Sequence, residues 1–273
     1  MKTRIISAAV GLILLAVALS LYGTIYFTVI VDIISLIAVY ELLKSTGILK
    51  HRAVSVISFI YSAFIPFISI NTVRDFFLPV TFCYVISLFL CLLIKHNELK
   101  FSKIATALFF SLFYPFAFTC LILIGKASPD FSAFYLLLVF SAAWISDTGA
   151  YFTGLALGKH KLCPEISPKK TVEGAIGGLV SAIISYVVIG FIFKSIYPNI
   201  EVNFILLLII APLASILGMM GDLSASVIKR EYNIKDYGNI MPGHGGVMDR
   251  FDSILFVLPF IYIILSYIEI IRI

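Results

Sequence analysis

Charged residues are scarce in this sequence. Asp, Glu, Lys and Arg together make up 13% of the 273 residues, whereas 61% are hydrophobic. A soluble globular domain typically has about 45–50% apolar residues. The composition therefore excludes an ordinary soluble domain and predicts an integral membrane protein.

Cysteine is also rare, and no two cysteines have CxxC spacing. The four residues are widely separated, and three lie in apolar runs: Cys83, Cys91, Cys120 and Cys163. This pattern argues against a disulfide framework or a zinc site and favours packing roles.

The positively charged residues are not gathered into one basic segment. The net charge of +5 comes from cations spread along the chain, so we expect no nucleic-acid partner.

Apolar runs close to the ~20 residues needed to cross a bilayer recur along the chain. We expect an all-α, polytopic membrane protein with about nine spans, at residues 5–22, 24–43, 53–70, 76–94, 104–124, 131–155, 174–193, 204–228 and 251–271.

The connections between these spans alternate in positive charge. Sixteen of the 20 Lys and Arg residues fall in every second segment, beginning with the N-terminus. The positive-inside rule then places the N-terminus in the cytoplasm and the C-terminus outside. We expect the inner (cytoplasmic) membrane, crossed many times.

The N-terminus has an alternative interpretation as a cleavable signal peptide. Lys2 and Arg4 precede an apolar run that includes Ala16-Val17-Ala18, as in a signal sequence. The run continues past that site, so we favour a retained first helix.

The first five spans carry little chemistry. Asp32 and Glu41 are the exceptions, and they lie about 180° apart on one helix. A structural or oligomer contact is favoured over catalysis for both. We therefore divide the chain at residue 125: residues 1–125 form a lipid-facing scaffold with potential oligomer contacts, and residues 126–273 form the catalytic region.

The sixth span ends in a run of small and polar residues. Asp147 and Tyr151 lie on one helix face, and Gly154 and Gly158 permit close backbone approach. An acid within a membrane span is a functional candidate by default. Asp147 is therefore a candidate site residue.

The following loop carries two adjacent lysines. Ser167-Pro168 is typical of a helix N-cap followed by proline at the first helical position, which would put Lys169 and Lys170 in the first turn. Helix N-terminal amides attract anions. These lysines are therefore candidates for phosphate binding, although topology alone also explains their charge.

The densest group of polar residues runs from Asp222 to Asp252. Asp222, Ser226, Lys229 and Arg230 share one helix face, and a loop with Lys235 follows. Glycines surround His244. Then Asp249 and Asp252, three apart, open the last helix on a common face next to Arg250. A carboxylate inside a bilayer costs about 2.5–3.5 kcal/mol, which acids converging on a divalent cation would offset. This stretch predicts a metal and phosphate site.

The segment from Ser226 to Asp252, SVIKREYNIKDYGNIMPGHGGVMDRFD, closely resembles the signature of the phosphatidate cytidylyltransferase (CDP-diacylglycerol synthase) family. The upstream ISPKKTVEG and SDTGAYFTG stretches resemble that family as well. Met241 stands where the family favours Leu, Ile or Phe, which is a volume-conserving apolar substitution. Spans 1 to 5 resemble the family only in being hydrophobic.

The resemblance implies a nucleotidyltransferase of phospholipid synthesis, with Mg²⁺ as cofactor. It would convert CTP and phosphatidic acid into CDP-diacylglycerol and pyrophosphate. Asp222 and Asp249 would hold the metal, and Asp252 or Asp147 would complete or orient its shell. The phosphate-binding residues would be Lys229, Arg230, Lys235, Arg250, Lys169, Lys170, Ser226 and His244.

Other functions stay open at this point. A CTP-dependent polyprenol or lipid kinase, or a related CDP-lipid synthase, would need similar residues. A secondary transporter is less favoured because the charges cluster at one membrane face rather than at the midplane. Gly174 and Gly178 are compatible with a homodimer and equally with intrachain packing.

Overall fold

The computed structural model describes residues 11, 13, 16–241, 243 and 245–272. Half of the expected first span, 5–22, lies outside these residues. The chain forms two compact units. Unit 1 comprises the described residues up to Leu123 together with Tyr232–Arg250, and unit 2 comprises Ile124–Glu231 and the described residues from Phe251 onward. The functional division at residue 125 stays a prediction.

Long apolar helices dominate both units. In the part of the chain that the structure describes, seven helical segments are long and apolar enough to cross a membrane: Ile25–Ser45, Arg52–Ser69, Phe77–Ile94, Phe101–Ala127, Ser132–Leu157, Val172–Ile196 and Phe204–Glu231. Each agrees with an expected span to within a few residues. The last expected span appears as a shorter apolar helix, Ile254–Tyr267.

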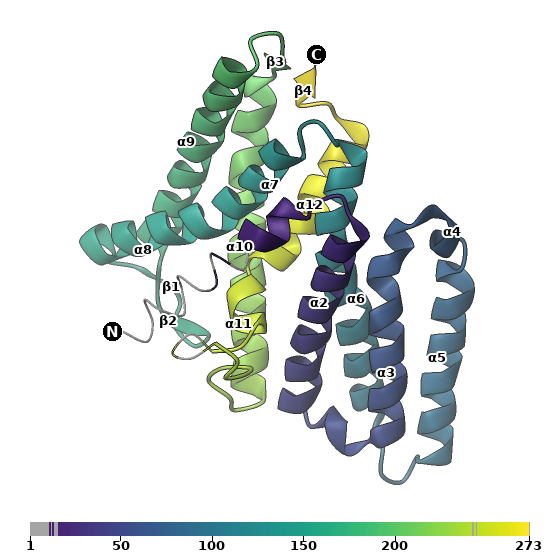
Figure 1. Ribbon diagram of the computed structural model, residues 1–273. Helices are drawn as coiled ribbons and strands as arrows, with labels where there is room; N and C mark the ends of the chain where they lie inside the picture. Colours follow the sequence, from purple (N-terminus) through teal and green to yellow (C-terminus); the bar gives the residue numbers. More distant parts are fainter. Residues whose placement is uncertain (1–10, 12, 14–15, 242, 244, 273) are drawn as a thin grey trace. The chain divides into compact units, whose positions relative to one another are not determined.

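Unit 1 is a group of neighbouring helices (Figure 1). Its elements are α2 (Ile25–Ser45), α3 (Arg52–Phe64), α4 (Asn71–Arg74), α5 (Phe77–Ile94) and most of α6 (Phe101–Ala127), with 3₁₀ segments at Ile48–Lys50 and Ile65–Ser69. Buried hydroxyls join three of the helices. Tyr84 of α5 hydrogen-bonds Ser58 of α3 at 2.9 Å, and it also bonds Ser111 of α6. Such bonds fix the order of helices whose surroundings are all apolar.

Unit 2 contains α7 (Ser132–Phe140), a π-helical turn (Ser141–Ile145), α8 (Ser146–Leu157), α9 (Val172–Ile196), α10 (Phe204–Glu231) and α12 (Ile254–Tyr267). Strands β1 (Lys161–Cys163) and β2 (Ser167–Thr171) form an antiparallel hairpin between α8 and α9. Strands β3 (Glu201–Val202) and β4 (Ile271–Arg272) also pair antiparallel. In Figure 1, α9 and α10 run side by side from this small β3–β4 sheet.

One face of α9 exposes large aliphatic residues at every fourth position. Ile176, Val180, Ile184 and Val188 are each about half exposed. The opposite face, including Gly178, Ala182 and Tyr186, is buried. An apolar stripe turned outward from a buried face is what a lipid-facing helix requires.

The expectation that Asp249 and Asp252 open one helix is wrong. The four-residue helix α11 (Met248–Phe251) ends before Asp252, and α12 begins only at Ile254. The Asp252 side chain accepts a hydrogen bond from the backbone N–H of Ser253 at 2.8 Å. This local bond is of the kind by which Asp competes with helical hydrogen bonding.

Candidate active site

The polar face of α10 forms as expected. Asp222, Ser226, Lys229 and Arg230 all lie in one uninterrupted helix, so their spacing places them along one side over its last turns. Asp222 and Ser226 are partly buried, whereas Arg230 is exposed. The Arg230 Nε donates to the carbonyl of Ile166 at 3.4 Å, which links the end of α10 to the β1–β2 hairpin.

The same hairpin brings a cation to Asp222. Lys170 Nζ lies 2.6 Å from Asp222 Oδ2, and each side chain is about one quarter exposed, at 25% and 27%. Both residues are site candidates from the sequence, but no feature of the sequence predicts that they pair. The ion pair joins β2 to α10, and it places a phosphate-binding candidate against a metal-binding candidate.

The lysines do not lie in the first turn of a helix, as the Ser-Pro pattern predicted. Ser167 to Thr171 form strand β2, and α9 begins at Val172. Thr171 is the N-cap, since its Oγ1 accepts a hydrogen bond from Gly174 N at 3.1 Å. The prediction failed because Thr171 is also an acceptable N-cap, and pairing of β2 with β1 keeps the preceding residues extended.

Three glycines surround the side chain of this N-cap. A Cβ added at Gly154, Gly158 or Gly174 would come within 2.8–2.9 Å of the Thr171 side chain. Thr171 itself is buried. The GxxxG formed by Gly154 of α8 and Gly158, the C-cap of α8, therefore serves packing within the chain. Gly174 and Gly178 likewise face α8 backbone oxygens, so these glycines give no separate support for a homodimer.

Asp147 lies at the start of α8, directly after the π-helical turn. Its Oδ2 accepts a hydrogen bond from Ser253 Oγ at 3.0 Å, and the carboxylate interacts electrostatically with Asp222 and Lys170. π-Helical turns frequently occur at functional sites. Ser253 was not among the sequence candidates; its place directly after Asp252 is the signal that could have found it.

Asp252 adds a third carboxylate to this group. It is buried, and it interacts electrostatically with Asp222, Asp147 and Lys229. Burial, followed by the negative charge of Asp222, raises the pKa of Asp252 above its ordinary value. We call Asp147, Asp222 and Asp252 the acidic group. Within unit 2 it concentrates negative charge next to two lysines.

A cavity of about 570 Å³ opens beside the acidic group. Asp147 and Asp222 line it together with three lysines, Lys161, Lys169 and Lys170. Other parts of its wall are apolar: Ala150, Tyr151, Leu155 and Met219. The cavity thus combines carboxylates, ammonium groups and apolar surface, as a ligand with both phosphate and apolar parts would require.

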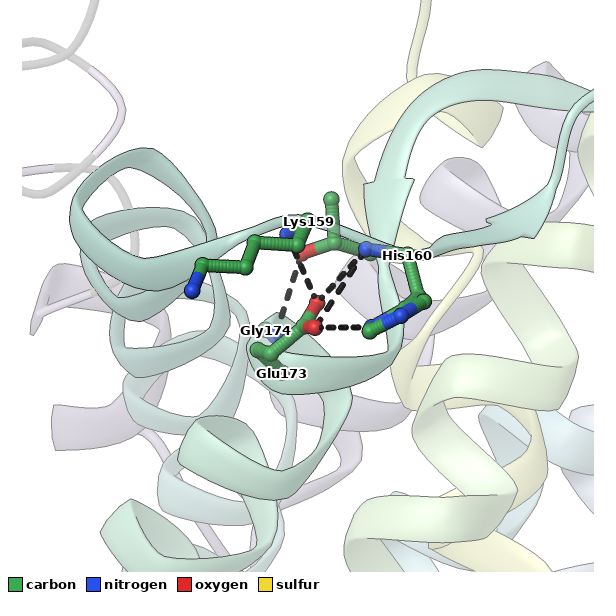
Figure 2. Close-up of polar contacts among 5 residues, drawn as sticks. Lys159, His160, Glu173 and Gly174 are labelled. Carbon is green, nitrogen blue, oxygen red and sulfur yellow. Dashed lines mark hydrogen bonds and ion pairs between the residues drawn. The ribbon is translucent and has the colours of Figure 1, made fainter.

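The Glu173 carboxylate holds in place the two residues that precede the β1–β2 hairpin. The Glu173 side chain, in the first turn of α9, accepts hydrogen bonds from the backbone N–H groups of Lys159 and His160 at 3.1–3.3 Å (Figure 2). His160 Nδ1 also lies 2.6 Å from Glu173 Oε1. These contacts attach the residues before β1 to the helix that follows β2. The hairpin that carries Lys169 and Lys170 is therefore closed at its base.

Replacing Glu173 by Ala should loosen this hairpin, because two backbone donors and the His160 ring lose their acceptor. We expect trypsin to cut at the lysines of residues 159–170 at least about 5-fold faster. Limited proteolysis in detergent followed by mass spectrometry measures this. Glu165→Ala is the matched control, since Glu165 is exposed in the turn of the same hairpin. Equal cleavage of both variants would contradict the role of Glu173.

In unit 1, Asp249 holds the loop that precedes it. We call residues 237–248 the signature loop. Asp249 Oδ2 accepts hydrogen bonds from Tyr237 N at 2.8 Å and Gly246 N at 3.0 Å, and Asp249 is buried. Gly243 and Gly245 have positive φ angles of 78° and 85°, which glycine adopts at no steric cost. Asp249 therefore has a clear role in shaping the loop, and its metal-binding role stays a prediction.

Three further candidates for phosphate binding, Lys235, His244 and Arg250, belong to the sequence range of unit 1. Lys235 and Arg250 are exposed, so both side chains are accessible to a charged ligand. His244 lies outside the described residues.

Oxygen ligands in the acidic group suit Mg²⁺. Among the residues that the structure describes, no three His, Cys, Asp or Glu side chains form a ready-made metal cage. Mg²⁺ seldom uses such a cage, since it keeps several waters and binds one or two carboxylates plus substrate phosphates. The donor set therefore fits Mg²⁺ that is bound jointly by protein and phosphates.

Comparison with known proteins gives a consistent result. Residues 2–268 match the model of the cytidylyltransferase family. The chain is 33% identical over 273 residues to the phosphatidate cytidylyltransferase of Bacillus subtilis (strain 168), covering 97% of this chain and 98% of that protein. It is also 48% identical over 131 residues to the phosphatidate cytidylyltransferases of Staphylococcus haemolyticus and Staphylococcus saprophyticus, which is 48% of each chain.

Proposed function

Because the chain belongs to the cytidylyltransferase family, we propose that it transfers the cytidylyl group of CTP to phosphatidic acid, giving CDP-diacylglycerol and pyrophosphate. The observation that carries this proposal is the cavity beside the acidic group, which joins carboxylates and lysines to an apolar wall in one space. Phosphatidic acid has the same two parts, a phosphate monoester and acyl chains.

The reaction needs little proton chemistry. The second pKa of a phosphate monoester is about 6, so phosphatidic acid is mostly dianionic near neutral pH. One of its phosphate oxygens attacks the α-phosphorus of CTP, the bond from this phosphorus to the oxygen bridging the β-phosphate breaks, and pyrophosphate leaves. The main obstacle is the approach of two anions. Positioning and charge neutralisation are the tasks of the protein.

The residues of the site divide these tasks. Lys170 and Lys169 bind phosphate oxygens at the cavity, and Lys229, Arg230 and Ser226 do so at the end of α10. His244 contributes from the signature loop, Lys235 from the segment just before that loop, and Arg250 from α11. Removing one cation should weaken binding of the phosphate that it contacts and leave the other substrate less affected.

Mg²⁺ is the proposed cofactor. Asp222 and Asp249 would hold it, and Asp147 or Asp252 would complete or orient its shell. When bound, Mg²⁺ would neutralise charge on the phosphate oxygens. Ser253 fixes the orientation of Asp147 through its hydrogen bond, a role that partners of metal-binding carboxylates commonly have.

We also propose which side of the membrane the active site faces. The site would face the cytoplasm, where CTP is dissolved, at the inner (cytoplasmic) membrane, and the N-terminus would lie on the same side. The lipid substrate would enter from the membrane between helices. The alternating loop charges support this orientation.

Transfer of label from α-³²P-CTP to chloroform-extractable lipid tests the proposal. We expect labelled lipid only when the purified protein, phosphatidic acid and magnesium are all present. No labelled lipid from folded protein, with several lipid phosphates supplied, would contradict it. Labelled lipid from γ-³²P-CTP would instead identify a CTP-dependent lipid kinase.

A further inference from the structure

Glu41 is a carboxylate buried beneath the signature loop of unit 1. It lies near the end of α2, in a helix long enough to span a membrane, and only 2% of its surface is exposed. Its Oε1 accepts a hydrogen bond from Val247 N at 3.1 Å and its Oε2 accepts one from Met248 N at 2.9 Å. Both oxygens are therefore used by the backbone of a segment 206 and 207 residues away in sequence.

Two glycines of the loop leave room for this carboxylate. A Cβ added at Gly238 would come within 2.1 Å of Glu41 Oε1, and one added at Gly246 would come within 2.3 Å. Neither glycine has a positive φ angle, unlike Gly243 and Gly245. A Cβ at position 238 or 246 would therefore push the Glu41 carboxylate away from its present place against the loop.

Glu41 and Asp249 hold the same loop from different elements. Asp249 accepts from Tyr237 N and Gly246 N, whereas Glu41 accepts from Val247 N and Met248 N. Hydrogen bonds from N–H groups to a carboxylate are about twice as strong as those between neutral groups. Together the two acids fix both ends of a loop whose glycines would otherwise leave it many conformations.

We propose that Glu41 is a positioning residue for the reaction. Its hydrogen bonds to Val247 N and Met248 N fix the backbone conformation at the start of α11. Glu41 therefore determines the positions of Asp249 and Arg250, which lie in that helix. Glu41 touches no substrate in this role. The kinetic part of the inference rests on the proposed function, because it assigns those two residues to metal and phosphate.

The key variant is Glu41→Gln, which keeps the size of the side chain but replaces one acceptor oxygen by an NH₂ group facing a backbone donor. Glu41→Asp retains the charge and both oxygens on a shorter stem. Asp32→Asn is the matched control, since it removes another carboxylate from α2, nine residues away and so on the opposite side of that helix. Its buried Oδ1 has no hydrogen-bond partner in the part of the chain that the structure describes.

Hydrogen exchange gives the first measurement, and it requires no activity. We expect the amides of residues 246–248 to exchange at least about 10-fold faster in Glu41→Gln than in the wild-type protein, and at the wild-type rate in Asp32→Asn. Unchanged exchange in Glu41→Gln would overturn the proposed anchoring. If Glu41→Gln does not fold, the same comparison is made with Glu41→Asp, for which we expect a smaller increase.

Steady-state cytidylyl transfer gives the second measurement. Displacing Arg250 and Asp249 should raise the KM for CTP, or the magnesium concentration for half-maximal rate, at least about 10-fold. A residue that only stabilised the fold would lower the amount of active enzyme and leave both values unchanged, and that result would overturn the positioning role. An inactive wild-type protein would contradict the proposed function, whereas an active wild type with unaffected Glu41 variants would contradict this inference alone.

Discussion

Replacing Asp222 by Asn should lower cytidylyl transfer by about 100- to 1,000-fold, the loss typical of removing one strong electrostatic stabiliser from an active site. Asn keeps the shape of the side chain but removes the charge that faces Lys170 at 2.6 Å. It also removes the carboxylate proposed for magnesium. The α-³²P-CTP assay at saturating CTP and phosphatidic acid measures the effect.

The matched control is Asp130→Asn, an exposed aspartate between α6 and α7, which should have wild-type activity. Both proteins should elute as folded, detergent-solubilised species, since Asp222 is partly exposed and Asn can still accept a hydrogen bond from Lys170. Near wild-type turnover by Asp222→Asn would contradict the site. An active Asp249→Asn enzyme would contradict the metal assignment while leaving Asp222 in place.

The second large effect concerns stability rather than chemistry. Gly177→Ala should destabilise unit 2 by about 1–3 kcal/mol, the usual consequence of overpacking a close contact. Its added Cβ would lie 2.4 Å from Thr153 Cβ and 2.2 Å from Thr153 Oγ1. Rotation of Thr153 cannot relieve contact with its own Cβ, so α8 and α9 must separate. Thermal unfolding in detergent should show a midpoint several degrees lower.

Two further variants make this result specific. Gly218→Ala in α10 places its Cβ no closer than 3.4 Å to another atom, so its midpoint should equal or slightly exceed that of the wild type. Combining Gly177→Ala with Thr153→Gly should recover most of the loss, because the clashing side chain is removed. Equal midpoints for the two alanine variants would show that α8 and α9 do not pack as closely as described.

The spans could be predicted from sequence because each depends on its own residues. A run of about 20 apolar residues must satisfy its backbone hydrogen bonds internally within a bilayer, whatever surrounds it. The face of α10 with Asp222, Ser226 and Lys229 was predictable for the same reason, since helical spacing alone sets it.

Two kinds of feature could not be predicted from local sequence. One is the start of a helix where two residues can each be the N-cap, and the other is a hydrogen bond between residues far apart in the chain. Ser167-Pro168 and Thr171 are both acceptable helix starts, and pairing of β2 with β1 decides between them. Hydrogen bonds from Ser253 to Asp147 and from Val247 to Glu41 join residues 106 and 206 positions apart. No periodicity in the sequence encodes such contacts.

The burial of Thr171 among Gly154, Gly158 and Gly174 also affects the thermodynamics of phosphate binding. Because Lys170 directly precedes the buried Thr171 in β2, its backbone conformation is already fixed before a phosphate binds. A lysine side chain has about 2 kcal/mol of rotamer entropy to lose, and the contact with Asp222 restricts part of it before any substrate arrives. Binding a phosphate at Lys170 should therefore carry a smaller entropic penalty than binding at a lysine on a mobile loop. The three glycines should thus favour phosphate binding through preorganisation of the backbone next to Lys170.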